Sequence, residues 1–332
     1  MTKKTTGNII LLLTALIWGS SFVAQTTGME HVQPFTFMGI RTMLGGLVLL
    51  PVIMIQRRVQ PIAQRPTPEV QRQTDRISLI GGICCGLVLC VASNLQQFGM
   101  VTTSPGKAGF ITSLYIVIVP LLGVFIGKKI PKIVWFCVAA ALLGFYLLCF
   151  TEQFTISAGD LLILCCAFFF SVHIMVIDHF SKKGVDGVLM SCIQFLTAGG
   201  ISILLMFICE SPTWAHIFAA RSSILYSGVM SCGIAYTLQI LGQNRTDPTS
   251  ATLIMSLESV FAALSGWLIL HESFSLREFL GCVLVFAAVI LSQLPLPQKK
   301  ITHAKEQHGL SLCCSFYSYI NVFLVTLLPA CG

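Results

Sequence analysis

Charge is scarce in this chain of 332 residues. Only 10% of the residues are Asp, Glu, Lys or Arg, whereas a typical soluble domain contains about 25%. Hydrophobic residues make up 55% of the sequence. This composition excludes an ordinary soluble domain and indicates an integral membrane protein whose surface contacts the lipid bilayer.

Sequence motifs of the common enzyme classes are also missing. No nucleotide-binding loop of the Walker type is present, and His271-Glu272 lacks the second histidine of a zinc-protease helix. His173, Asp178 and His179 have a loose spacing for metal ligands. We therefore predict a protein that is not an enzyme and has no cofactor or metal. The alternative is a membrane-embedded enzyme or scaffold that uses the same kind of helix bundle.

Long apolar stretches are what the sequence contains instead. Each is close to the roughly 20 residues that a membrane-spanning helix requires. The ten predicted spans are residues 9–27, 34–55, 77–99, 104–126, 133–150, 159–179, 188–209, 222–243, 248–270 and 275–294. Pro120 lies inside the fourth span and is expected to kink it. Gly45-Gly46 and Gly199-Gly200 are expected to let helices pack closely in lipid.

The positions of the basic residues predict the orientation, because cytoplasmic loops retain Lys and Arg during insertion. A cytoplasmic N-terminus puts all of the 20 Lys and Arg residues on the inner side except Arg41, Lys107, Arg221 and Arg277. We therefore expect a multi-pass protein of the cell inner (cytoplasmic) membrane. The net charge of +7 is explained by this topology, so nucleic acid is not an expected partner. Residues 56–76 are expected to form a flexible cytoplasmic linker.

The sequence repeats itself after about 143 residues. Residues 92–123 match residues 235–266 without a gap, pairing Gln96 with Gln239, Gly99 with Gly242, Pro105 with Pro248, Ala108 with Ala251, and Ser113-Leu114 with Ser256-Leu257. Five spans per copy is an odd number, so the second copy must enter the membrane from the opposite side. The expected fold is an all-α membrane protein with ten transmembrane helices in two inverted five-helix repeats, residues 1–150 and 151–294.

Three features together resemble the EamA-like transporters of the drug/metabolite transporter superfamily. Residues 15–23 read ALIWGSSFV, the second span carries Arg41, and residues 257–264 read LESVFAAL ahead of His271-Glu272. The resemblance covers about residues 7–294. One departure is Gly127-Lys128-Lys129, where many relatives have an acidic residue like Glu272. The resemblance implies a transporter of small metabolites, often amino acids or related compounds and often exported, without an ATPase domain.

Two ionisable residues lie deep in the predicted spans, where a charge is costly and usually serves a pathway or a partner. Glu258 is ten residues into its span, about 15 Å from the cytoplasmic end. It is either a structural acid that fastens helices together or a group that binds substrate or protons. Arg41 is expected to pair with a carboxylate or with helix carbonyls, and the alternative is that it anchors an anionic substrate group.

Aromatic and amide residues complete a predicted central substrate site. Trp18 and Tyr236 lie near mid-depth in their spans, and the repeat places Tyr115 opposite the position of Glu258. Their rings suit a metabolite of mixed polarity, although each alone is more often a packing residue. Gln96 and Gln239 fall near opposite membrane faces and are candidate gating residues.

The end of the chain does not belong to the repeat. Residues 295–332 are first basic and then apolar, and residues 309–330 are long enough for an eleventh span. We expect a poorly ordered or interfacial tail, with a real span and a non-native extension as alternatives. The sequence leaves open the substrate, the coupling ion, protons included, and the oligomeric state, a homodimer included.

Overall fold

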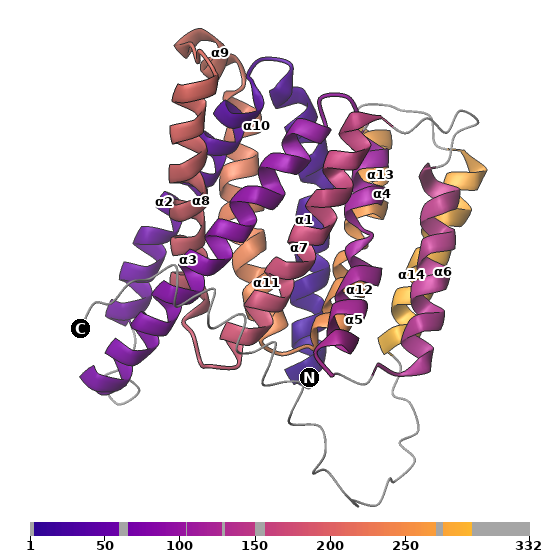
Figure 1. Cartoon of the computed structure of the whole chain (residues 1–332), viewed down its shortest axis with the longest axis horizontal. Coiled ribbons are helices and arrows are strands. Elements are labelled where there is room, and N and C mark those ends of the chain that lie inside the picture. The colour runs from indigo at the N-terminus through magenta and orange to yellow at the C-terminus, as the bar shows by residue number, and fades with distance from the viewer. Residues whose placement is uncertain are drawn as a thin grey trace, which may run out of the picture.

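The computed structural model describes residues 3–59, 66–103, 105–127, 130–149, 157–269 and 275–293, and every regular element in these ranges is a helix (Figure 1). The all-α prediction is therefore confirmed. The helices are α1 (Lys3–Met29), α2 (Pro34–Val59), α3 (Pro68–Gly99), α4 (Pro105–Thr112), α5 (Tyr115–Phe125), α6 (Lys132–Cys149), α7 (Ala158–Ser181), α8 (Gly187–Cys209), α9 (Trp214–Ala219), α10 (Arg221–Leu225), the π-helix η2 (Tyr226–Ala235), α11 (Tyr236–Gln243), α12 (Pro248–Met255), α13 (Glu258–Ile269) and α14 (Leu276–Gln293). The predicted C-terminal tail, residues 295–332, and His271-Glu272 lie outside the described residues.

Eight stretches of the described chain are long and apolar enough to cross a membrane, so the protein is a multi-pass membrane protein. They are α1, α2, α3, α7 and α8, together with the stretches Ala108–Phe125, Arg221–Gln243 and Pro248–Ile269. The predicted spans 133–150 and 275–294 fall on α6 and α14, whose apolar stretches are shorter. The count of ten spans therefore stays a prediction.

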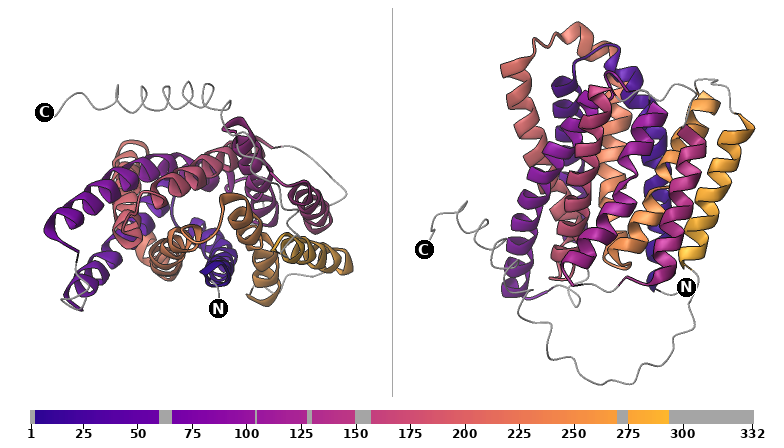
Figure 2. Two further views of the ribbon diagram at one scale, coloured as in Figure 1. Left: turned by 90° about the horizontal axis from the view of Figure 1, so that it is seen from below. Right: turned by 45° about the vertical axis from the view of Figure 1, so that its right-hand side comes forward.

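The helices form one bundle in which α1 is central. α1 packs against α13, η2 and α11. One edge of the bundle is the pair α6 and α14, and the other contains α2, α3 and α8 (Figures 1 and 2). The largest buried cluster lies between α1, the two interrupted helices and the α6–α14 pair, and it includes Leu11, Tyr115, Phe145, Leu253 and Val285. This cluster holds the interrupted helices against the centre of the bundle.

Glycines bring α2 and α8 into close contact. Gly46 of α2 lies against Leu196 of α8, and Gly199 of α8 lies against Met43 of α2. A side chain at either glycine would collide with the opposite helix, which confirms the packing predicted for this pair. Gly200 has open space where a side chain would be, so the packing role predicted for it is wrong.

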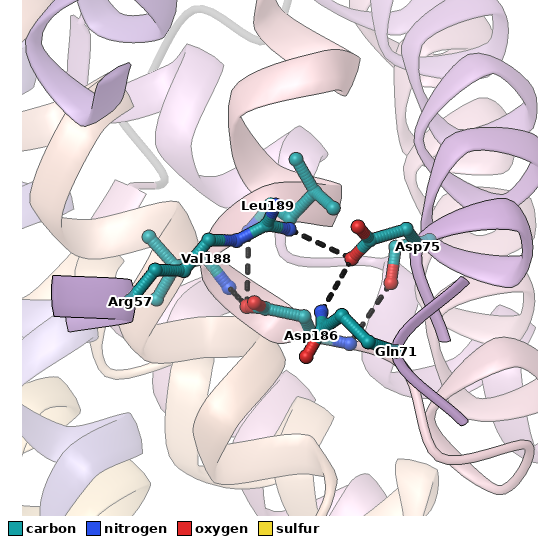
Figure 3. Close-up of polar contacts among 7 residues, drawn as sticks. Arg57, Gln71, Asp75, Asp186, Val188 and Leu189 are labelled. Atoms are coloured by element: carbon teal, nitrogen blue, oxygen red, sulfur yellow. Dashed lines mark hydrogen bonds and ion pairs between the residues drawn. The ribbon is translucent and has the colours of Figure 1, made fainter. Parts of the chain in front are cut away.

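Of the predicted flexible linker 56–76, residues 60–65 lie outside the described residues, whereas residues 56–59 and 68–76 belong to helices. α2 continues to Val59 and α3 already begins at Pro68, where Thr67 accepts a hydrogen bond from the Val70 N–H. Arg57 Nη2 donates to Asp75 Oδ1 at 2.7 Å, and Gln71 Nε2 donates to the same oxygen at 2.8 Å (Figure 3). A capped start with Pro at the first turn and these side-chain contacts extend both helices beyond the apolar stretch.

Two spans predicted as continuous helices are interrupted at corresponding places. α4 and α5 are separated by Ser113-Leu114, and α12 and α13 by Ser256-Leu257. At both breaks a backbone hydrogen bond spans three residues instead of four. The N–H of Leu114 donates to Ile111 O at 3.2 Å, and the N–H of Leu257 donates to Ile254 O at 3.2 Å.

Pro120 does not cause the interruption in the first copy. α5 runs through Pro120, and the break lies earlier in the chain, at Ser113-Leu114. The second copy has the same break although Ala263 stands in the position that corresponds to Pro120. The break is therefore a shared feature of the two copies that does not depend on a proline, and the kink expected at Pro120 stays a prediction.

The predicted span 222–243 is also not a regular α-helix. Its central ten residues form η2, whose backbone hydrogen bonds reach five residues back rather than four. The Tyr226 hydroxyl at the start of η2 lies 2.6 Å from Ser20 Oγ of α1, and Thr14 Oγ1 donates to Ala235 O at its end, at 3.4 Å. The wider helix is thus attached to α1 at both of its ends.

Candidate functional site

One cavity in the middle of the bundle brings together the residues that the sequence predicts for substrate binding and gating. Its space, counting the part that is open to solvent, is about 510 Å³. All seven predicted substrate-binding and gating residues line it. The lining residues are Trp18, Phe22, Gln25, Arg41, Gln96, Thr112, Tyr115, Phe170, Ile174, Ser231, Tyr236, Gln239, Met255 and Glu258.

The two helix interruptions bring Tyr115 and Glu258 together. Tyr115 is the first residue of α5 and Glu258 is the first residue of α13, positions that the sequence repeat pairs with each other. The Tyr115 hydroxyl donates a hydrogen bond to Glu258 Oε1 at 2.9 Å. The side chains are buried, with 3% and 5% exposure. A buried carboxyl with one polar partner is costly to keep charged, so this contact joins the two interrupted helices through an ionisable group.

Hydroxyl groups bind the same two helices to each other beside this contact. Ser259 Oγ of α13 donates to Gly109 O of α4 at 2.9 Å. Ser113 Oγ and Ser259 Oγ are also hydrogen-bonded. These bonds fix the relative position of the two breaks, and therefore of Tyr115 and Glu258, on the cavity wall.

Aromatic rings form another part of the wall. The ring centroids of Trp18 and Tyr236 are 4.7 Å apart with planes inclined at 60°. Tyr236 also contacts Phe195 at 5.2 Å and His173 at 6.1 Å in edge-to-face geometry. Trp18 Nε1 is buried and has no acceptor among the described residues. The wall thus presents aromatic surface together with an unused N–H donor.

Arg41 is where the sequence-based expectation was wrong. Its side chain is buried, with 5% exposure, and among the described residues it has no carboxylate within ion-pair distance. Neither Nε nor Nη1 has a hydrogen-bond acceptor in this part of the chain. Its guanidinium instead lies 5.4 Å from the centre of the Phe37 ring. The expected pairing with a carboxylate or helix carbonyls is therefore not made by these atoms.

Gln96 and Gln239 lie on the walls of the same cavity. Gln96 Nε2 donates to Thr112 Oγ1 at 3.0 Å, whereas Gln239 Oε1 is buried without a donor among the described residues. Gln96 lies in the last turn of α3 and Gln239 is in the middle of α11. Their gating role stays a prediction.

Several lining residues were not anticipated. Gln25 is 4% exposed, and its Oε1 lacks a donor in the described structure. An amide within an apolar helix was a signal that could have identified it. Ser231 reaches the cavity from η2, and Phe170 from α7, and neither position stands out in the sequence. His173 Nε2 lies 3.0 Å from Gln194 Oε1 behind this wall.

The described residues contain no group of three His, Cys, Asp or Glu side chains that could hold a metal ion. Arg41 is the basic residue of the lining set and Glu258 is the acidic one. The arrangement can therefore offer one positive group, one ionisable carboxyl, amides and aromatic faces to a small molecule.

Comparison with known proteins gives consistent matches along the chain. The sequence model of the EamA-like transporter family matches residues 5–150 and again residues 157–294. An uncharacterized transporter of Archaeoglobus fulgidus is 27% identical over 296 residues, which cover 88% of this chain and 87% of the relative. The uncharacterized transporter YoaV of Bacillus subtilis is 22% identical, with 88% and 98% covered.

Two further matches agree with these. The uncharacterized inner membrane transporter YedA of Escherichia coli is 23% identical, and the match covers 83% of this chain and 87% of YedA. A protein of known crystal structure that is 18% identical superposes with a TM-score of 0.69, covering 87% of this chain and 96% of the other. That structure shares the fold of this chain.

Proposed function

The chain belongs to the EamA-like transporter family, and on this premise we propose that it moves a small metabolite through the central cavity by alternating access. The family and the names of the relatives indicate a membrane transporter rather than an enzyme. Within that class, we propose an amino acid or a related compound as substrate and export from the cell as the direction. The cavity's mixed aromatic, amide and ionisable lining supports a compact solute with polar and apolar parts.

We propose that two inverted five-helix repeats, residues 1–150 and 151–294, rock against each other around the cavity. Reciprocal packing supports this arrangement, because α1 packs against α13 while α7 packs against α4 and α5. In the same way α3 packs against α7 while α1 packs against η2 and α11. These contacts between the halves thus occur in matching pairs, as a twofold axis in the membrane plane requires.

We propose that the end of the bundle that carries the N-terminus faces the cytoplasm of a cell whose inner membrane holds the protein. Asn8 near the start of α1 is hydrogen-bonded to Thr246, which follows α11, so both belong to this end. Basic residues gather near it, including Lys3, Lys4, Lys182, Lys183 and Arg245. The distribution of basic residues supports a cytoplasmic N-terminus.

The observation that carries the mechanism is the hydrogen bond between Tyr115 and Glu258. It joins corresponding positions of the two interrupted helices on the wall of the cavity. Motion of one half relative to the other changes the surroundings of this carboxyl, which can then exchange a proton with one side of the membrane at a time. Glu258 is therefore proposed to couple proton or substrate binding to the movement of the helices.

Counterflow in proteoliposomes tests this function. Vesicles containing the full-length protein are loaded with a single unlabelled amino acid, and uptake of the same labelled compound is followed for each amino acid in turn. At least one compound should exchange faster than in protein-free vesicles, and Glu258→Gln should slow this exchange. The control is Glu30→Gln, which removes a carboxylate from an exposed position at the end of α1. Equal exchange in wild type and Glu258→Gln would remove Glu258 from the mechanism.

A further inference from the structure

Arg41 carries a buried charge without a protein counter-ion in the described structure. Its side chain is 95% removed from solvent, since 5% is exposed, and it lies in the apolar helix α2. Glu258 lines the same cavity, yet no ion pair joins the two, and Glu258 bonds to Tyr115 instead. An uncompensated charge within a membrane span is unfavourable, and such residues mark ligand pathways unless they are paired.

The unused hydrogen-bonding atoms around the cavity point to the missing partner. The Nε and Nη1 groups of Arg41 and the Nε1 group of Trp18 are donors without acceptors among the described residues. Buried donors in folded proteins are normally satisfied, so three unsatisfied ones on residues lining a single cavity favour an acceptor supplied by a ligand. A planar guanidinium matches the two oxygens of a carboxylate particularly well.

We infer that Arg41 binds a single carboxylate of the transported compound. This inference rests on the proposed transport function, but it concerns the chemical class of the solute. Among the described residues, the lining contains one basic residue, so it balances one negative charge and would leave a phosphate monoester, with nearly two charges, undercompensated. Gln25 Oε1 and Gln239 Oε1 are unused acceptors on the same lining, so a hydrogen-bond donor elsewhere on the solute can be satisfied too.

The contact between Arg41 and Phe37 supports the same assignment. The ring is 5.4 Å from the guanidinium carbon, and an aromatic face stabilises a cation without using its N–H groups. Phe37 therefore helps to hold the charge in an apolar setting while the N–H groups stay available for a bidentate carboxylate. This arrangement positions a binding residue and leaves its hydrogen-bonding capacity unused.

Thermal unfolding of the purified full-length protein in detergent tests the inference without a prior substrate. Four monocarboxylates with apolar side chains are compared with their own primary amides: L-leucine, L-phenylalanine, 4-methylpentanoate and 3-phenylpropionate. At least one carboxylate should stabilise the wild type while its amide, equal in shape but uncharged at the carboxyl position, should not. Stabilisation by amides alone, or by no carboxylate in the panel, would overturn the inference.

Variants assign the effect to Arg41. Arg41→Gln should weaken binding of the stabilising carboxylate about 10- to 100-fold, as expected for loss of a charged hydrogen-bond partner. Arg41→Lys keeps the charge and loses the planar fork, so it should bind with intermediate affinity and also reports if Arg41→Gln does not fold. Arg221→Gln is the matched control, because Arg221 lies outside the cavity and donates to Phe218 O at the start of α10.

Two further measurements distinguish an inorganic anion from an organic carboxylate, and failure of this inference from failure of the proposed transport function. Stabilisation by sodium chloride equal to that by the carboxylates would identify an inorganic anion and overturn the inference. Arg41-dependent carboxylate binding without counterflow of any solute would leave the anion site standing and remove the transport proposal. Counterflow of uncharged solutes with no carboxylate binding would do the reverse.

Discussion

The two interrupted helices place different chemistry at the same position. At the start of its second segment, α4–α5 has Tyr115, whereas α12–α13 has Glu258, and the two side chains bond to each other across the cavity wall. The backbone break is common to both copies, but only one copy carries a carboxyl group there. The two copies thus share a fold but differ in the side chain that each presents to the cavity at its break.

A second difference lies in the helices that precede the breaks. α3 is a regular α-helix from Pro68 to Gly99, while the corresponding part of the other copy is the π-helix η2. The gap-free sequence match begins at Ala92 and Ala235, and Ala235 is the last residue of η2. Upstream, Gly86 packs against α8 and Gly228 packs against α2, and their separation is 228 − 86 = 142 rather than 235 − 92 = 143 residues. One extra residue in the second copy is thus absorbed by the wider helix.

The largest effect is expected from substitutions of Glu258 and Tyr115 themselves. Glu258→Gln should reduce counterflow on the order of 10- to 100-fold, because it removes the carboxyl group from the wall of the cavity. Tyr115→Phe removes one hydrogen bond and should reduce counterflow by less than about tenfold. Both variants are assayed in proteoliposomes at matched protein content. Equal losses in the two variants would contradict a division of roles between the copies.

The next largest effect concerns the packing of α1 against α13, the helix that carries Glu258. Gly19 of α1 lies against Phe261, Ala262 and the Glu258 carbonyl, so Gly19→Ala should lower the free energy of unfolding by about 1–3 kcal/mol through overpacking. Chemical unfolding in detergent measures it. Gly200→Ala is the control, because its added methyl group meets no atom within 4 Å. A Gly19→Ala protein as stable as the Gly200→Ala protein would show that α1 and α13 are not tightly packed.

A smaller effect is expected at the α9 end of α2. Glu210, which follows α8, accepts from Phe35 N at 2.7 Å and from Thr36 N and Oγ1 at 2.7 and 2.6 Å, so it caps α2. Glu210→Gln should lower the free energy of unfolding by about 1–2 kcal/mol, because a neutral amide replaces the carboxylate that accepts three hydrogen bonds. The measurement is the same unfolding experiment. An unchanged midpoint would mean that the cap contributes nothing to the α2–α8 contact.

The smallest effect is expected at the opposite end of α2. There Asp186 caps its own helix through Val188 N and Leu189 N, at 3.0 and 3.1 Å, while Arg57 pairs with Asp75 of α3 (Figure 3). The Arg57 and Asp75 side chains are 42% and 34% exposed, so solvent screens the pair and Asp75→Asn should cost less than about 1 kcal/mol. A larger loss of unfolding free energy in Asp75→Asn than in Glu210→Gln would contradict the prediction that the exposed pair contributes less than the Glu210 cap.

Much of the cavity could be predicted because its residues violate the rules of an apolar span. Glu258 and Arg41 stand out as charges, and the repeat alone paired Tyr115 with Glu258. The position of Arg41 against Phe37 rather than a carboxylate could not be predicted in this way, because it depends on which side chains the fold brings within reach. The breaks at Ser113-Leu114 and Ser256-Leu257 escaped notice because these residues are compatible with a continuous helix.

The boundaries at the end of α2 and the start of α3 were mispredicted for a related reason. Hydropathy reports where lipid ends and not where a helix ends, so the polar turns around Thr67 and Asp75 read as a loop. Capping and side-chain pairing decide such ends, and both depend on local geometry. The π-helix could not be predicted from the sequence, because one additional residue changes the spacing of the backbone hydrogen bonds without changing the composition of the helix.

The extra residue in η2 also bears on the history of the chain. If both halves descend from one duplicated segment, the one-residue difference between Gly86–Ala92 and Gly228–Ala235 was fixed after the duplication, in one copy alone. A single insertion turns every side chain before it by about 100° relative to those after it, unless the helix widens to absorb the change. The π-helix therefore lets the residues on both sides of the extra position keep the register that they share with α3.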